Sequence, residues 1–170
     1  MGDLEVLEQY KNKMETLKIK KIVEDLEDIN YTRDGDAALD LRASGKWIIN
    51  LDENKEEIIN NEYEIKPNER ILIKTGIKIE IPKWHYGQIK DRSGLAMKYG
   101  LNIMGGVIDE NYRDEIGVIM INHGSKSYKL IKNERIAQMI IKKYTKVNVE
   151  YVDELNKTAR EGGFGSSGTI

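Results

Sequence analysis

Apolar and polar residues alternate along most of the chain, and this spacing of two predicts strands with one buried face. The segments that we interpret as strands are residues 17–19, 47–49, 71–73, 77–81 and 147–151. Residues 116–121 are apolar at almost every position, as expected for a central strand buried on both faces. Short strands separated by Gly, Asn and Asp, with no convincing helix after the first 16 residues, predict an all-β sandwich or barrel.

The two ends of the chain differ from this β pattern. Asp3 can cap a short helix whose apolar stripe is formed by Leu4, Leu7, Tyr10, Met14 and Leu17. The last residues are rich in Gly and Ser and contain Phe164, the only phenylalanine of the chain. By composition this is most often a frayed tail, but such a segment can also order over a ligand, with its N–H groups toward phosphate and its ring against a base. We predict an N-terminal helical extension (1–16), a β domain (17–156) and a C-terminal arm (157–170).

Composition narrows the classes of function. The net charge is −2, whereas nucleic-acid binding is typical of chains with a basic excess. The chain has no cysteine, which excludes disulfides and thiolate metal sites. No apolar run approaches the roughly 20 residues that cross a bilayer, and the acidic N-terminus lacks the features of a signal peptide. We expect a cytoplasmic protein with no membrane or nucleic-acid partner.

Three further segments carry residue types that suit a nucleotide. Residues 91–96 (Asp-Arg-Ser-Gly-Leu-Ala) combine a guanidinium, a hydroxyl and a flexible backbone, which suits an anion, although an ordinary turn has the same composition. Gly105 and Gly106 let the backbone approach a flat ligand beside the Asp109 carboxylate; the alternative is a plain hairpin turn. Asp40 lies between apolar residues, where the alternative to a functional role is a turn cap or a structural ion pair.

Together these segments resemble the five sequence motifs of the trimeric dUTPases, in the order of that family. The corresponding residues are 37–43, 92–96, 106–113, 134–140 and 162–168. The resemblance extends from about Leu17 to Gly168. It implies a dUTPase-like, jelly-roll-like β-sandwich or barrel that forms homotrimers with active sites shared between subunits. It also implies hydrolysis of dUTP to dUMP and pyrophosphate, which limits uracil incorporation into DNA and supplies dUMP for thymidylate synthesis.

Four positions depart from the pattern of the family. Ala38 stands where glycine is usual, and Asp114 stands where glycine commonly follows Tyr-Arg. Aspartate tolerates the left-handed conformation better than most residues, so we expect that turn to survive. Ser167 replaces a frequent threonine, and Arg160 precedes Phe164 by four residues where five are common.

The resemblance also implies a role for each motif residue. Asp109 is implied to be the general base that activates the attacking water, a role a carboxylate within hydrogen-bond reach can perform. Mg²⁺ is implied to bridge the phosphates and to be held by Asp40 through water. The substrate contacts are implied to come from Arg92, Ser93, Gly94, Asn102, Gly106, Val107, Ile108, Tyr112, Gln138, Arg160, Phe164, Gly165 and Ser166.

Within this set, backbone groups of a hairpin at residues 101–108 are implied to pair with the uracil edge. Tyr112 is implied to pack under the deoxyribose and to exclude a ribose 2′-hydroxyl. Arg92, Ser93, Gly94 and Gln138 are implied to contact phosphates, Arg160 and Ser166 to close on the γ-phosphate, and Phe164 to stack on uracil.

The other notable side chains have simpler interpretations. Arg135 is expected to form a structural ion pair, and His85 and His123 have no catalytic partner in the sequence. We interpret Trp47 and Trp84 as packing residues, and we expect Glu110 and Glu115 to face solvent because side chains alternate along a strand.

Two alternatives remain open. A dCTP deaminase shares the fold and the trimer, but the catalytic set of that family is not apparent here, and the Gly-Phe-Gly-Ser arm favours a dUTPase. A regulatory binding protein could use the same fold to capture a partner protein in response to nucleotide, with the N-terminal helix as a contact; docking of that helix on its own trimer is the simpler alternative.

Overall fold

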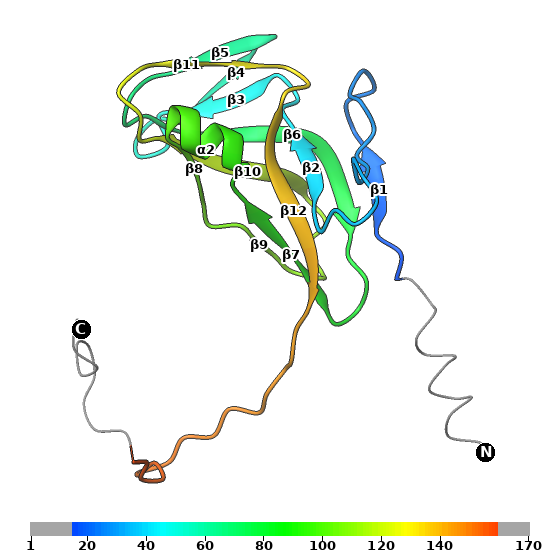
Figure 1. Ribbon diagram of the computed structural model, residues 1–170, viewed down its shortest axis with the longest axis vertical. Coiled ribbons are helices and arrows are strands. Elements are labelled where there is room, and N and C mark those ends of the chain that lie inside the picture. Colours follow the sequence, from blue (N-terminus) through cyan, green and yellow to red (C-terminus); the bar gives the residue numbers. More distant parts are fainter. Residues whose placement is uncertain (1–14, 160–170) are drawn as a thin grey trace.

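Strand alternation dominates the folded chain, as the sequence predicted. The computed structural model describes residues 15–159, which form a β-sandwich with one short helix and an extended C-terminal segment (Figure 1). The all-β prediction is therefore confirmed. The predicted N-terminal helix and the arm residues Arg160, Phe164, Gly165 and Ser166 lie outside the described residues.

The described strands form two main sheets and a small one, and all pairs are antiparallel. The first sheet has the order β4 (Glu56–Ile59), β3 (Lys46–Ile49), β6 (Arg70–Glu80), β10 (Glu115–Asn122) and β8 (Leu101–Met104). A sixth strand, β1 (Lys18–Lys21), pairs with β6 outside this order. The second sheet has the order β2 (Leu39–Arg42), β12 (Arg135–Lys143), β7 (His85–Lys90), β9 (Val107–Ile108). The third pairs β5 (Glu62–Ile65) with β11 (Tyr128–Ile131).

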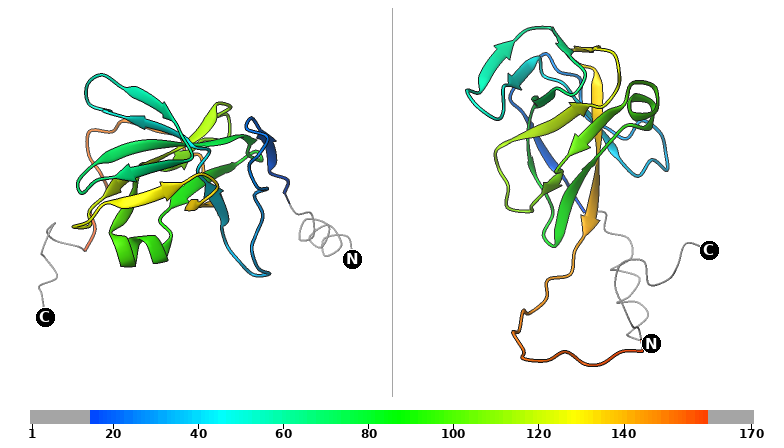
Figure 2. Two further views of the ribbon diagram at one scale, coloured as in Figure 1. Left: turned by 90° about the horizontal axis from the view of Figure 1, so that it is seen from above. Right: turned by 90° about the vertical axis from the view of Figure 1, so that its left-hand side faces the viewer.

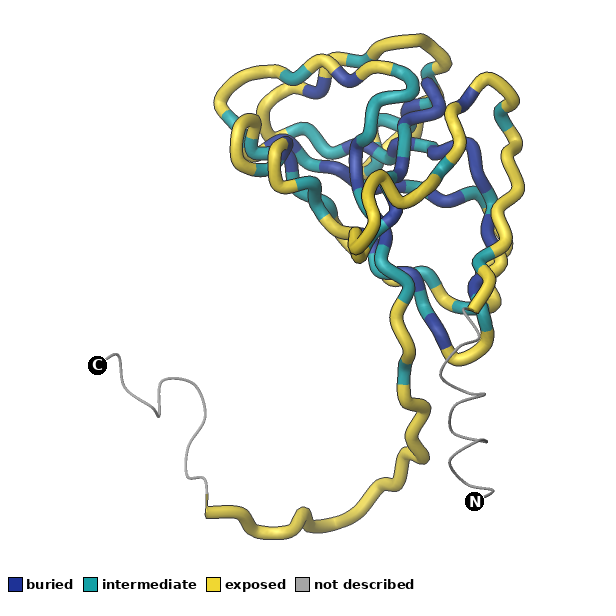
Figure 3. The backbone as a smooth tube through the Cα atoms, turned by 45° about the vertical axis from the view of Figure 1, so that its right-hand side comes forward, coloured by how far each residue is buried: buried dark blue, intermediate teal, exposed yellow. Residues whose placement is uncertain are grey.

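The core forms because each long strand buries every second side chain. β10 pairs with both β6 and β8, so its predicted central position is confirmed. Buried and half-buried residues alternate strictly along it, so one face is fully buried and the other only in part, not both faces as predicted. Trp47 is fully buried, as predicted for a packing residue, and its indole N–H donates to the Asn60 carbonyl at 3.1 Å. Figure 3 shows the buried positions gathered inside the sandwich.

Helix α2 (Ser93–Tyr99) corrects the prediction that no helix follows residue 16. It was missed because it is only seven residues long, buries only Leu95 and has no side-chain cap at its N-terminus. Gly100 ends it in the left-handed conformation at φ 71°. A Cβ at Gly100 would lie 2.7 Å from the backbone nitrogen of Gly124, so only glycine fits there.

The predicted strand at residues 147–151 is also wrong. After β12 the chain leaves the sandwich, and residues 145–159 are exposed and contain no strand (Figures 1 and 3). The right-hand view of Figure 2 shows this segment standing clear of the sheets. The alternating apolar residues Val147, Val149 and Tyr151 form a pattern typical of a strand in a sheet. Within residues 15–159, however, no strand pairs with this segment. No helix in the described part of the chain is long and apolar enough to span a membrane.

Candidate active site

Three neighbouring strands of the second sheet bring three of the motif-like segments together. β12 lies between β2 and β7, and its register pairs Gln138 with Asp40 on one side and with Lys90 on the other. Lys90 ends β7, so Arg92 and Ser93 follow at once and lead into α2. Residues from the first, second and fourth motifs therefore meet around Gln138.

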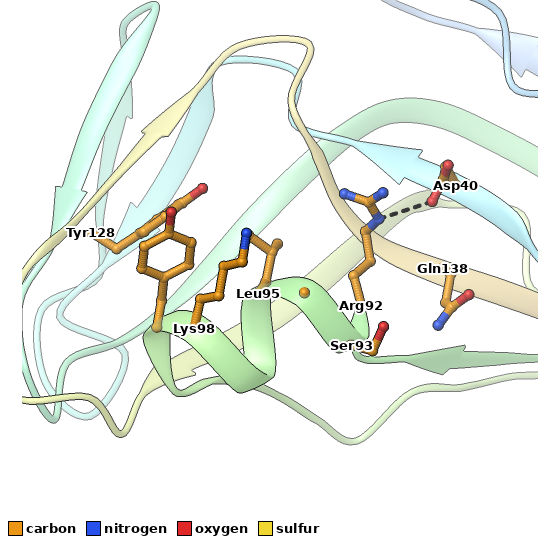
Figure 4. Close-up of a pocket in the computed structure, with 9 residues that line it drawn as sticks. Asp40, Arg92, Ser93, Leu95, Lys98, Tyr128 and Gln138 are labelled. Carbon is orange, nitrogen blue, oxygen red and sulfur yellow. Dashed lines mark ion pairs between the residues drawn. The ribbon is translucent and has the colours of Figure 1, made fainter.

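These residues line a surface pocket of about 400 Å³, here called the Arg92 pocket (Figure 4). It is lined by Asp40, Arg92, Ser93, Gly94, Leu95, Lys98, Tyr99, Tyr128 and Gln138. A guanidinium, an ammonium group and several hydroxyl and amide groups thus face one hollow. This chemistry suits a ligand with several anionic oxygen atoms.

Asp40 lies between two arginines at the wall of this pocket. Its Oδ1 is 3.1 Å from Arg92 Nε, and its Oδ2 is 3.1 Å from Arg135 Nη1. Arg92 Nη1 also donates to the main-chain carbonyl of Arg135 at 3.0 Å. The interpretation of Arg135 as a structural ion pair is confirmed, and the same ion pairs hold Arg92 in a fixed orientation at the pocket.

The start of α2 adds backbone donors to the pocket. Ser93 and Gly94 are the first two residues of the helix, and the first N–H groups of a helix have no intrahelical acceptor. A Cβ added to Gly94 would meet nothing within 4 Å, so the backbone is open to a ligand at this point. Residues 91–96, for which an ordinary turn was the alternative to an anion site, thus contain a helix start that can donate to an anion.

The single carboxylate at this pocket suits a hydrated metal ion better than an ion whose ligands all come from the protein. Asp40 is the only acidic residue that lines the Arg92 pocket, and residues 15–159 hold no group of three or more His, Cys, Asp or Glu side chains that could bind a metal. Mg²⁺ keeps several of its water molecules and is usually held by one or two carboxylates together with substrate phosphates. Asp40 beside an anion pocket meets that requirement.

Asp109 lies at a different place, directly after the two-residue strand β9. Its side chain is exposed and lines a second pocket of about 760 Å³, here called the Asp109 pocket, with Tyr86, Val107, Glu110, Tyr144 and neighbouring residues. The carboxylate makes no hydrogen bond or ion pair within residues 15–159. The two pockets share no lining residue, so in a single chain Asp109 and the Arg92 pocket are separate.

Residues 101–108 do not form the predicted hairpin. β8 pairs with β10 in the first sheet, whereas β9 pairs with β7 in the second, so this segment crosses from one sheet to the other. Gly105 and Gly106 make the crossing, at φ 70° and φ 102°. Gly106 packs against β7, where its carbonyl accepts the Ile89 N–H at 2.8 Å, and a Cβ there would lie 2.8 Å from the Ile89 carbonyl oxygen.

The two glycines offer a matched pair of substitutions. Gly106→Ala is expected to lower the free energy of unfolding by about 2–3 kcal/mol, because it adds a collision with the Ile89 carbonyl to the strain of a positive φ. Gly105→Ala has the positive φ but nothing within 4 Å of the new Cβ, so about 1 kcal/mol is expected. Urea unfolding of both variants measures the difference. Equal losses would show that the close approach at Gly106 is unimportant.

Asp91 ties the crossing segment to the Arg92 pocket, and sequence reasoning missed it. Its Oδ1 accepts the Ile103 N–H at 2.6 Å, and its Oδ2 accepts the Asn102 side-chain amide at 3.0 Å. Gln138 donates to the Asp91 carbonyl at 2.7 Å. Asp91 therefore orients the Asn102 side chain, whose amide oxygen remains available to accept from another donor. The only signal in the sequence was the position of Asp91 beside Arg92.

Tyr112 is held at both ends while its ring is partly exposed. Its N–H donates to the Asp109 carbonyl at 3.1 Å, and its hydroxyl donates to the Glu115 carbonyl at 3.0 Å. Desolvation, with the nearby Asp114 and Glu115 carboxylates, raises the pKa of Tyr112. The phenol is thus neutral at physiological pH, and its ring is kept beside Asp109. Asp114 has no positive φ, so the left-handed turn that we expected at this position is not needed.

Two further expectations about single side chains are wrong, and a third holds in part. Glu115 does not face solvent, because a β-bulge turns it inward, where it accepts the Gly76 N–H at 2.8 Å. Trp84 is 49% exposed rather than packed in the core, because it lies in the turn before β7. Glu110 is half-buried, and its carboxylate accepts the Trp84 N–H at 2.6 Å in a solvent-exposed hydrogen bond, because strand alternation no longer applies beyond the end of β9.

Three residues of the Arg92 pocket, Lys98, Tyr99 and Tyr128, lie outside the segments that the sequence indicated. Lys98 and Tyr128 reach the pocket from α2 and β11 (Figure 4). Burial, together with a hydrogen bond to Glu134, raises the pKa of Tyr128, so its hydroxyl stays neutral. Lys98 and Tyr99 did not stand out because α2 itself was not expected, and Tyr128 lies outside the motif-like segments.

The fold and these pockets define a class: an antiparallel β-sandwich whose strand ends and helix start are arranged to bind a nucleotide. Comparison with known proteins agrees with this. The dUTPase family model matches residues 58–168. A deoxyuridine 5'-triphosphate nucleotidohydrolase of Clostridium tetani is 44% identical over 156 residues, which cover 90% of this chain and 97% of that protein. The chain belongs to the dUTPase family.

Solved structures show the same fold. Native EIAV dUTPase is 30% identical, with a TM-score of 0.63, and the match covers 84% of this chain and 100% of that chain. A dUTPase of Staphylococcus phage 80alpha is 24% identical, with a TM-score of 0.75 over 91% of this chain and 100% of that chain. The second likeness concerns the fold alone.

Proposed function

We propose that this protein is a dUTP diphosphatase that hydrolyses dUTP to dUMP and pyrophosphate in the cytoplasm. The observation that carries the proposal is the meeting of the first, second and fourth motifs at the Arg92 pocket, with Asp109 exposed at a second pocket directly after β9. The product dUMP serves thymidylate synthesis, and removal of dUTP keeps uracil out of DNA.

Asp109 is the general base of the proposed reaction. Its carboxylate takes a proton from a water molecule while that oxygen attacks the α-phosphorus of dUTP. The bond from the α-phosphorus to the bridging oxygen breaks, and pyrophosphate leaves. The exposed position of Asp109 leaves room for both the water and the substrate.

The Arg92 pocket binds the triphosphate. Arg92, Ser93 and the open backbone at Gly94 donate to phosphate oxygens, and Gln138 completes the wall. Asp40 would hold Mg²⁺ through water, and the bound ion would neutralise the charge that develops on the pyrophosphate. In the arm, Arg160 and Ser166 close on the γ-phosphate and Phe164 stacks on the uracil, while Gly165 also contacts the substrate.

The segment from Asn102 to Ile108 reads the uracil edge. Ile103 N–H is already bonded to Asp91, so the recognition depends on the other groups, including the oriented Asn102 amide and the backbone of Gly106, Val107 and Ile108. Cytosine presents a donor at position 4 where uracil presents an acceptor. A buried donor left unpaired costs about 1–3 kcal/mol, which corresponds to one to two decades of discrimination.

Tyr112 provides the choice of sugar. The Tyr112→Ala variant is expected to raise kcat/KM for UTP relative to that for dUTP, because the ring leaves no room for a 2′-hydroxyl. Parallel assays of the two substrates measure this ratio. An unchanged ratio would place sugar discrimination elsewhere.

The active protein is a homotrimer whose sites are shared between subunits. Two features support this. Asp109 and the Arg92 pocket lie in separate pockets of one chain, so another subunit is needed to bring them together. The alternating apolar residues Val147, Val149 and Tyr151 are exposed in one chain, which suits pairing with a neighbour.

A product assay separates this proposal from a deaminase on the same fold. The purified protein is incubated with Mg²⁺ and either dUTP or dCTP, and pyrophosphate and ammonia are both measured. We expect pyrophosphate from dUTP and no ammonia from dCTP. Ammonia release from dCTP would overturn the proposal.

A further inference from the structure

The residue after Asp109 is held by two other elements of the fold. The Glu110 carboxylate accepts the backbone N–H of Trp84 at 2.6 Å, from the turn before β7. Tyr144, the first residue after β12, lines the same pocket as Glu110, and its hydroxyl lowers the pKa of Glu110. These three residues are called the Glu110 clasp.

The two partners of Glu110 are themselves joined. Tyr144 N–H donates to the Trp84 carbonyl at 3.0 Å, and the two rings are tilted with their centroids 6.2 Å apart. Trp84 has φ 65°, a conformation that is rare for a bulky residue and that aims its N–H at Glu110. Lys83 Nζ lies 5.2 Å from the Trp84 ring centroid. The turn and the start of the C-terminal segment therefore form one unit.

Glu110 is the point at which the Asp109 loop is tied to this unit. In the described structure the other hydrogen bonds of residues 109–113 are local: Arg113 Nη1 donates to the Glu110 and Tyr112 carbonyls at 2.6 and 2.8 Å, and Tyr112 bonds to Asp109 and Glu115. The loop is thus closed on itself, and among residues 15–159 the Glu110 carboxylate alone hydrogen-bonds it to elements outside the loop and the strand that follows.

The charges around the clasp favour an ionised Glu110. The Trp84 N–H and the Tyr144 hydroxyl lower the pKa of Glu110, and Lys83 and Lys146 act in the same direction. Desolvation, and then the carboxylates of Glu110 and Asp109, raise the pKa of Tyr144, so its hydroxyl remains a donor. Glu110, Tyr144 and Asp109 line the same pocket.

We propose that Glu110 is a positioning residue, which fixes the Asp109 loop against Trp84 and the start of the C-terminal segment at Tyr144. The inference rests on the proposed function, in which Asp109 activates the attacking water. The Asp109 carboxylate has no hydrogen bond of its own among the described residues, so its position depends on the loop. Without the clasp, the Asp109 carboxylate moves away from the attacking water molecule, while the substrate contacts at the Arg92 pocket remain.

Steady-state kinetics with dUTP test whether loss of the clasp lowers kcat and leaves KM unchanged. Glu110→Ala is expected to lower kcat on the order of 10- to 100-fold, since small misplacements of a catalytic group have effects of this size, with KM nearly unchanged. Glu110→Gln keeps an oxygen that can accept the Trp84 N–H, so its kcat should stay within a few-fold of wild type. Asp114→Ala, which removes an exposed carboxylate five residues after Asp109, is the matched control and should behave as wild type.

Hydrogen exchange provides a second readout that does not depend on turnover. The Trp84 amide should exchange faster in Glu110→Ala than in wild type, and should stay protected in Glu110→Gln. If Glu110→Ala fails to fold, Tyr144→Phe replaces it, and a smaller loss of kcat is expected. Wild-type kcat in the folded Glu110→Ala protein, or equal losses in the Ala and Gln variants, would overturn the clasp. A wild-type protein that protects the Trp84 amide but releases no pyrophosphate from dUTP would overturn the proposed function instead.

Discussion

The Asp109→Asn variant should bind dUTP and fold normally but lose about 10²- to 10⁴-fold in kcat, the usual contribution of a general base. Asparagine keeps the shape of the side chain, but its amide cannot accept the proton of the attacking water. Stability should be unaffected, because the Asp109 side chain is exposed and makes no hydrogen bond or ion pair within residues 15–159. The loss therefore falls on the transition state rather than on the fold or the ground state.

Pyrophosphate release under saturating dUTP measures kcat, and binding of a non-hydrolysable dUTP analogue measures affinity. Asp114→Asn is the matched control, because it changes another exposed carboxylate near the same loop. Near-normal turnover by a correctly folded Asp109→Asn protein would remove Asp109 from its role.

The second large effect concerns mixed trimers. Asp109→Asn and a chain truncated after Asn156 should each be inactive, since one lacks the base and the other lacks Phe164 and the rest of the arm. Refolded together in equal amounts they should regain activity, because a truncated subunit can supply Asp109 while a full-length subunit supplies the arm. With random mixing, half of the sites receive an intact Asp109 and half receive an intact arm. About one site in four should therefore receive both.

Native mass spectrometry establishes that mixed trimers have formed before their activity is measured. If Asp109 and the arm of each site came from the same chain, no complete site could form. Verified mixed trimers without activity would contradict a site built from several chains.

The β architecture could be predicted because strand alternation is a local property of the sequence. The alternating residues of β6 and β10 show in the sequence which side chains enter the core. Alternation does not show which other strand, if any, pairs with a segment. For that reason residues 147–151 were predicted to be a strand, although no strand forms there in this chain. Helix α2 was missed for the opposite reason, since seven residues with one buried leucine leave almost no periodic pattern.

The candidate site was predicted from motif order, whereas its supporting contacts could not be. Asp40, Arg92 and Gln138 belong to motif-like segments, and the register of β2, β12 and β7 explains why they meet. Asp91 and Glu110 act through partners 11 to 47 residues away, such as Gln138 and Trp84. Contacts at such separations depend on the folded chain, so composition and spacing do not reveal these partners, even though Asp91 stands next to Arg92 in the sequence.

The central claim is that water attacks the α-phosphorus of dUTP, and oxygen labelling tests it most directly. The reaction is run in H₂¹⁸O, and dUMP and pyrophosphate are analysed by mass spectrometry after a single turnover. The account predicts one ¹⁸O atom in the phosphate of dUMP and none in pyrophosphate. Label in pyrophosphate would place the attack on the β-phosphorus and contradict the account.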